Sequence, residues 1–142
     1  MTDTERALAI AEIRNLKARY WHAVDTRDAA KLRAVFSPDA VMPAHGDIAE
    51  TRDADGFVAN LIRSLSGSVS LHVGGPGEIE ILSEDTARGI WAMEDRIWAE
   101  EGSTLPFRSL HGWGHYHDEY RRTPEGWKIQ SFILERVRVE TT

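Results

Sequence analysis

Residues 78–99 have the sequence EIEILSEDTARGIWAMEDRIWA, two runs of alternating apolar and polar side chains separated by a short polar stretch. An alternation with a period of two predicts β-strands at residues 78–82 and 86–99. The three residues 83–85 are too few for a crossover connection, so the two strands must be antiparallel neighbours. This part of the chain is therefore expected to form a hairpin, which is the centre of a larger sheet.

Three further segments carry the same period and extend that sheet. They are residues 69–74, 108–121 and 128–139. The last two are joined by the short turn Thr123-Pro124-Glu125-Gly126, which predicts a second hairpin. Both are longer than the average strand of about 5–6 residues, and long strands favour a bent, coiled sheet over a flat one.

Before residue 67 the apolar residues recur at helical spacing instead. A first long helix is expected to start at the capping-box pair Thr2 and Glu5 and to run to about Asp25. Two shorter helices are expected after the capping residues Asp28 and Asp53. Short extended pieces are expected at residues 40–42 and 47–50. Helices followed by a meander predict an α+β fold, with the helices packed on one face of a strongly curved antiparallel sheet.

Length, composition and charge limit the function classes. The 142 residues suit one domain, residues 1–142, that buries about two thirds of its unfolded surface. Cysteine is absent, which excludes disulfide scaffolds and thiolate metal sites and fits a cytoplasmic location. A net charge of −6 argues against nucleic-acid binding, and neither a secretory signal nor a membrane span of about 20 apolar residues is expected. The expected partners are a small molecule and other copies of the chain.

Four segments together resemble the SnoaL-like branch of the nuclear-transport-factor-2-like superfamily. They are AEIRNLKARYWHAVDTRD from residue 11, LHVGGPGEIEI from 71, DTARGIWAMEDRIW from 85 and GHYHDEYRRTPEGWKI from 114. The nearest group is that of scytalone dehydratase, bile-acid 7α-dehydratase and hexachlorocyclohexane dehydrochlorinase. The resemblance implies a cone-shaped α+β barrel and a homo-oligomer, with a trimer favoured and a dimer as the alternative. It transfers fold more readily than function.

The resemblance also implies a catalytic site, because enzymes of this group pair an aspartate near the end of the first helix with a histidine on a strand. Asp25 and His72 match those two positions, and Tyr20 matches a third. A carboxylate beside Nδ1–H fixes one imidazole tautomer and leaves Nε2 free as a base. Tyr20 could donate a hydrogen bond to a leaving group, although its spacing equally suits a core aromatic residue. Tyr20 and Asp25 point about 140° apart on an ideal helix. Both can reach one pocket only if the end of the helix wraps around that pocket or unwinds.

Strand parity groups further side chains on common faces of the sheet, which the resemblance implies to be inward and substrate-binding, with a plain core role as the alternative for Phe132. They are Trp91, Met93, Asp95, Tyr116 and Phe132. An inward Asp95 would have to be paired or bound to substrate, whereas at the mouth of the cone it would be hydrated, and both readings are open. Arg136 and Arg138 have the same parity and are expected to share a face, as charges either in solvent or at a subunit interface.

Three aromatic or imidazole side chains, Trp113, His115 and His117, are expected on the outer sheet surface. A subunit interface explains them better than the alternative of a metal site. No cofactor and no metal are expected. The leading functional hypothesis is a cofactor-free lyase that removes a proton with His72 from a hydrophobic cyclic molecule. The alternatives are a ketosteroid-isomerase-like isomerase and a non-catalytic binding or oligomerisation module.

Overall fold

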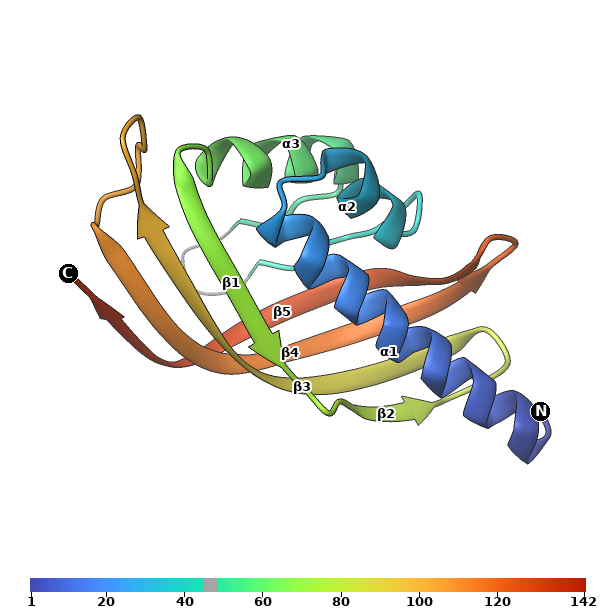
Figure 1. Ribbon diagram of the computed structural model, residues 1–142. Coiled ribbons are helices and arrows are strands. Elements are labelled where there is room, and N and C mark those ends of the chain that lie inside the picture. The colour runs from blue at the N-terminus through green and yellow to red at the C-terminus, as the bar shows by residue number, and fades with distance from the viewer. Residues whose placement is uncertain (45–48) are drawn as a thin grey trace.

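The computed structural model describes residues 1–44 and 49–142, and its elements follow the predicted order (Figure 1). The helices are α1 (Asp3–Asp25), α2 (Ala29–Val35) and α3 (Ala54–Ser64). The strands are β1 (Ser68–Gly74), β2 (Glu78–Ile81), β3 (Thr86–Ala99), β4 (Ser109–Thr123) and β5 (Gly126–Thr141). The α+β class is confirmed. Of the two expected extended pieces, Met42 of the first pairs with Thr51; half of the second, residues 47–48, lies outside the described residues, and residues 49–50 belong to no strand.

The helix starts follow from the predicted caps. Thr2 and Glu5 form both bonds of a capping box at the start of α1. The side chains of Asp28 and Asp53 accept from backbone N–H groups in the first turns of α2 and α3. The caps therefore fix where each helix begins.

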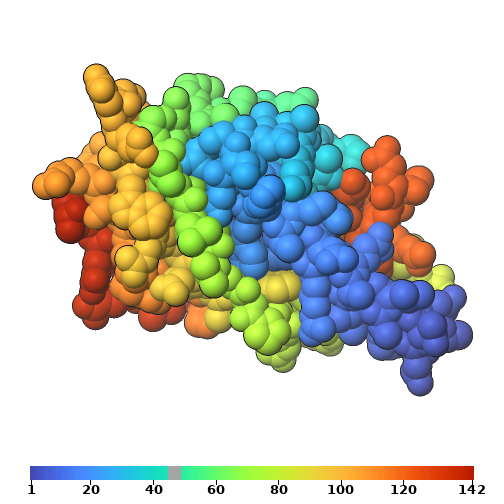
Figure 2. All heavy atoms as spheres, in the orientation of Figure 1, coloured from blue at the N-terminus to red at the C-terminus, as the bar shows by residue number. Residues whose placement is uncertain are grey.

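The sheet is antiparallel and strongly curved, and it is not closed into a barrel. Its order is β1-β3-β4-β5, and β2 pairs with the other half of β3, so β1 and β2 share one edge and β5 forms the other. Helix α1 crosses the hollow of this sheet, and α2 and α3 lie over one end (Figure 1). On the face in Figure 2, α1 lies beside β1, which brings the end of the first helix to the first strand.

Two bulges in β5 decide which of its side chains point inward. Trp113 pairs with Arg138 but its neighbour Gly114 pairs with Arg136, so Val137 is an extra residue on β5. A second shift, between Glu119 and Tyr120, leaves one more unpaired residue on the same strand. An extra residue reverses the alternation, so Arg136 faces the interior while Arg138 stays outside.

The interior between α1 and the sheet holds aromatic rings and one buried ion pair. Lys17 Nζ lies 2.8 Å from Asp118 Oδ2, and both side chains are fully buried. The ammonium also lies 3.7 Å from the ring centroid of Tyr116, and Asp118 Oδ2 accepts a 2.7 Å hydrogen bond from Tyr120.

Among the described residues, no helix combines the length and apolar character needed to cross a bilayer.

Candidate active site

Asp25 and His72 form a hydrogen-bonded pair where the C-terminus of α1 meets β1. Asp25 Oδ1 lies 2.7 Å from His72 Nδ1, and Asp25 Oδ2 accepts the backbone N–H of His72 at 2.8 Å. The hydroxyl of Ser70 donates to Asp25 Oδ1 at 2.8 Å. Three donors thus hold one carboxylate, and the imidazole is joined to it through Nδ1, as the resemblance implied.

These donors also keep Asp25 ionised. Burial raises the pKa of the Asp25 carboxyl, but the hydrogen bonds from His72 and Ser70 outweigh it and hold that pKa below its ordinary value. A charged carboxylate favours a proton on the nitrogen that faces it, and in the Nδ1–H tautomer the neutral imidazole has its lone pair on Nε2.

The other nitrogen of His72 faces a second carboxylate. His72 Nε2 is 3.7 Å from Asp95 Oδ2 on β3, and the Asp95 side chain is 2% exposed. Arg136 holds Asp95 with two bonds, Nη1 to Oδ1 at 2.7 Å and Nη2 to Oδ2 at 3.0 Å. Of the two readings of Asp95, the structure thus has the inward, paired one. The expectation that Arg136 shares a face with Arg138 is wrong, because the bulge at Val137 turns Arg136 toward the cavity, where its side chain stays 31% exposed.

A mainly apolar cavity of about 220 Å³ lies beside these groups, under α3. Its walls are Tyr20, Val24, Met42, Thr51, Phe57, Leu61, Leu65, His72, Asp95, Ile97, Tyr116, Phe132, Leu134 and Arg136. The hydroxyls of Tyr20 and Tyr116 are 3.4 Å apart in this wall. Tyr20 lines the cavity and Asp25 does not. His72 lies between the cavity and Asp25, because it lines the cavity and also pairs with Asp25 through Nδ1.

The predicted substrate-binding residues fall into two groups. Asp95, Tyr116 and Phe132 line the cavity. Trp91 and Met93 are buried on the same face of β3 but are not among the lining residues, and Trp91 donates from Nε1 to the Tyr120 hydroxyl at 2.8 Å. A direct contact of these two with a ligand stays a prediction, and their observed role is packing.

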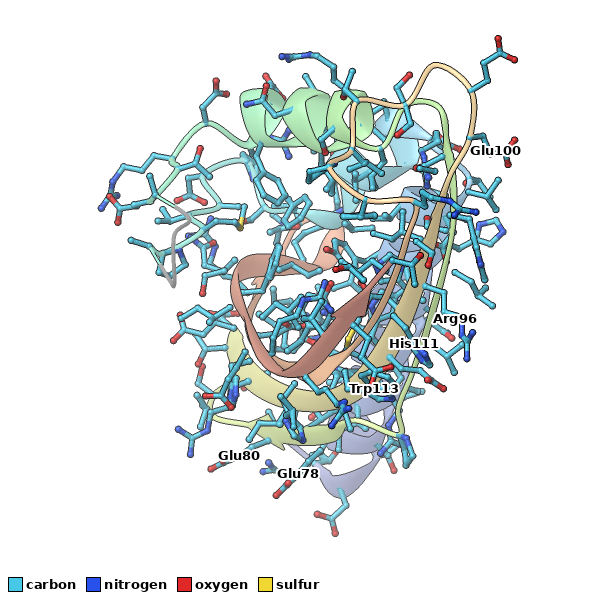
Figure 3. The ribbon with its side chains drawn as sticks, turned by 90° about the vertical axis from the view of Figure 1, so that its left-hand side faces the viewer. Glu78, Glu80, Arg96, Glu100, His111 and Trp113 are labelled. Carbon is cyan, nitrogen blue, oxygen red and sulfur yellow. The ribbon has the colours of Figure 1, made fainter. Side chains whose placement is uncertain are left out.

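On the outer side of the sheet, His111 lies 3.9 Å from Trp113, centroid to centroid, and 2.7 Å through Nε2 from Glu94 (Figure 3). His117 is 3.7 Å from Glu135. Among residues 1–44 and 49–142, no three His, Asp or Glu side chains gather as a metal site would require. These two outer imidazoles thus have carboxylate partners of their own, away from the cavity.

Comparisons with known proteins agree with this fold. A sequence model described as SnoaL-like domain matches residues 5–133. The curated protein Probable cyclase FGR4 of Gibberella zeae is 25% identical over 144 positions, covering 91% of each chain.

Two solved structures have the same fold along almost the whole chain. Hexachlorocyclohexane dehydrochlorinase LinA-type3 of Novosphingobium barchaimii superposes with a TM-score of 0.81 at 22% identity, over 99% of this chain and 94% of that one. A protein of Novosphingobium aromaticivorans provisionally named scytalone dehydratase gives 0.84 at 15% identity, over 99% and 92%. At such identities the structural likeness establishes the fold.

Proposed function

This chain belongs to the SnoaL-like domain family, and we propose that it is a cofactor-free lyase in which His72 removes a proton from a small hydrophobic cyclic substrate. One observation carries the proposal: His72 is joined through Nδ1 to an ionised Asp25 and lines an apolar cavity. The names of its relatives, a dehydrochlorinase, a dehydratase and a cyclase, are compatible with elimination chemistry in such a cavity.

In the first step His72 Nε2 accepts a proton from carbon. The imidazolium that forms is stabilised on both sides, by Asp25 at Nδ1 and by Asp95 3.7 Å from Nε2. Arg136 holds both oxygens of Asp95, so this carboxylate is fixed beside the imidazolium as a counter-charge. Groups held in place beside a charge that develops in the transition state can contribute much of a rate enhancement.

The second step is departure of the leaving group. The electron pair of the broken C–H bond forms a C=C bond while the C–O bond at the neighbouring carbon breaks, and hydroxide leaves as water with a proton from an acid in the site. Burial raises the pKa of both Tyr20 and Tyr116 above the ordinary phenol value, so both hydroxyls remain protonated donors. We propose that the two tyrosine hydroxyls donate hydrogen bonds to the carbonyl oxygen or the leaving oxygen of the substrate. The imidazolium of His72 then gives its proton to the leaving hydroxide, which departs as water.

The cavity limits the substrate class. Its volume of about 220 Å³ lies below the roughly 300–1,000 Å³ typical of sites for drug-sized ligands. Its walls are mostly aromatic and aliphatic, with the polar atoms of His72, Asp95, Arg136 and the tyrosine pair at one side. A ketone of one or two rings with a hydroxyl β to the carbonyl matches both features, since its α-proton is acidic and its ring is apolar.

The active form is proposed to be a homo-oligomer, with a trimer favoured over a dimer. Large apolar side chains are exposed together on the outer face of the sheet edge, with Val69, Leu71 and Val73 of β1 each at least 50% exposed. The outer face of β3 adds Trp98, which pairs with Val69 across the ladder. Contiguous apolar surface of this kind marks interaction sites.

The probe 3-hydroxy-1-tetralone tests the proposal, because loss of water from it gives 1-naphthol, which is fluorescent. We expect naphthol formation by the wild type and its loss in His72→Gln, whereas His22→Gln, on the exposed side of α1, keeps the wild-type rate. Deuterium uptake next to the carbonyl in D₂O without naphthol release would indicate the isomerase alternative.

Two results would count against the proposal. Turnover that survives in His72→Gln would remove His72 as the base. Binding without water loss or exchange, across a panel of hydroxylated one- and two-ring ketones, would identify a non-catalytic binding module.

A further inference from the structure

Arg27 has an unusual backbone and a heavily used side chain directly after the helix that carries Asp25. Its φ is 55°, in the left-handed region that few non-glycine residues adopt. Its guanidinium donates to the carbonyl oxygens of Val24, Leu65 and Ser68 at 2.6, 3.4 and 3.0 Å. These bonds tie the end of α1 to the start of β1.

The same guanidinium reaches the Asp25–His72 pair through one intermediate. Arg27 Nη1 donates to Ser70 Oγ at 2.8 Å, and Ser70 Oγ donates to Asp25 Oδ1 at 2.8 Å. Ser70 is 6% exposed, so water has little access to this link. Because Arg27 takes one lone pair of the Ser70 oxygen, the hydroxyl hydrogen is directed at Asp25.

We propose that Arg27 and Ser70 are positioning residues that hold the Asp25 carboxylate so that neutral His72 carries its proton on Nδ1. The inference rests on the proposed function, because the tautomer matters only if His72 Nε2 is the base.

Such positioning is needed because two carboxylates compete for the imidazole N–H. Asp25 lies at Nδ1 and Asp95 lies 3.7 Å from Nε2. A proton drawn to Nε2 by Asp95 would leave no lone pair facing the cavity. Arg136 weakens Asp95 as an acceptor by occupying both of its oxygens, and the Arg27–Ser70 link keeps Asp25 in place. The charged groups around His72 are thus Asp25 of α1, Asp95 of β3 and Arg136 of β5. Arg27 is one step farther away and reaches Asp25 through Ser70.

A purely structural role for Arg27 predicts something different. Its bonds to three carbonyl groups and to Ser68 would then serve only to hold the turn, and the Ser70 hydroxyl would be incidental. Ser68 offers a matched comparison. Its hydroxyl also accepts from Arg27, at 3.0 Å, and its own hydrogen goes to the carbonyl of Leu65 instead of to Asp25.

The test is the tautomer of neutral His72, read from long-range ¹H–¹⁵N spectra of the ligand-free protein, with the His72 signals assigned by their loss in His72→Gln. We expect the wild type and Ser68→Ala to carry the proton on Nδ1. Ser70→Ala should shift the population toward Nε2–H. Arg27→Gly should shift it the same way; glycine tolerates the positive φ, so this variant removes the side-chain bonds without straining the backbone.

Each outcome decides one claim. A wild-type Nδ1–H tautomer that persists unchanged in folded Ser70→Ala would overturn the positioning role and leave the proposed base intact. A wild type protonated mainly on Nε2 would overturn both the positioning role and the proposed function. An equal shift in Ser68→Ala and Ser70→Ala would mean that Arg27 acts only by closing the turn, and would also overturn the inference.

Discussion

Replacing Lys17 by methionine should destabilise the protein by about 3–5 kcal/mol, because it leaves the fully buried Asp118 without its counter-ion. The intact pair contributes little net stability. At an effective dielectric constant of about 20, two charges 2.8 Å apart attract by about 6 kcal/mol, and desolvation of the two ions costs several kcal/mol each. Breaking the pair removes the attraction and keeps the cost of burying Asp118.

The double variant that combines Lys17→Met with Asp118→Asn separates this explanation from simple loss of packing. Its new amide oxygen could still accept the Tyr120 hydroxyl and would carry no charge. We therefore expect the double variant to regain most of the stability lost in Lys17→Met. The exposed pair of Arg88 and Glu80 is the control, and Arg88→Met should change stability by less than about 1 kcal/mol.

Urea denaturation followed by circular dichroism measures the wild type, the two single variants, the double variant and the control. For a chain of this size the loss in Lys17→Met corresponds to a fall in Tm of about 10–15 °C. A double variant as unstable as the sum of its two single variants would refute the reasoning, since the cost would then lie in packing at each position and not in an unpaired charge.

Tyr20→Phe keeps the ring and removes one donor, so it should lower kcat for elimination by about 10²-fold; an unchanged kcat would make Tyr20 a packing residue only. Asp25 should make stability pH-dependent, because its folded pKa is below the ordinary value, so that the unfolded chain binds more protons as pH falls. The stabilisation is fully present above the ordinary Asp pKa of about 3.9 and is lost as the pH falls through the lower folded pKa of Asp25, and Asp25→Asn should not show this loss in denaturation curves. Light scattering at micromolar concentration should give an oligomer, and Leu71→Glu on the exposed face of β1 should weaken it; a wild-type monomer contradicts the proposed assembly.

Local rules were sufficient for most of the fold. The capping box placed the start of α1, and the alternation along β3 correctly put Trp91 and Asp95 on one common face, which the structure shows to be the buried one. The same rule failed for Arg136, because Val137 is an extra residue in β5 and a bulge has no reliable sequence signal. The ionic partner of Asp95 was missed for that reason.

The buried Lys17 was missed for a different reason. It falls within the apolar stripe formed by Ile13, Leu16 and Tyr20, and a charge inside such a stripe indicates a buried partner. Identifying that partner as Asp118 requires the packing of α1 on β4, which spacing along the chain does not contain. The link from Arg27 to Asp25 through Ser70 depends on the same kind of long-range packing.

The measurement that tests the central claim most directly is a double-mutant cycle on the elimination rate, with Asp25→Asn, His72→Ala and the two combined. Each single change should lower kcat by about 10²–10⁴-fold, because one removes the base and the other no longer holds its tautomer. Since the two side chains are proposed to act as one unit, the double variant should be little slower than the slower single variant. A double variant whose loss equals the product of the two single losses would show that Asp25 and His72 do not work together.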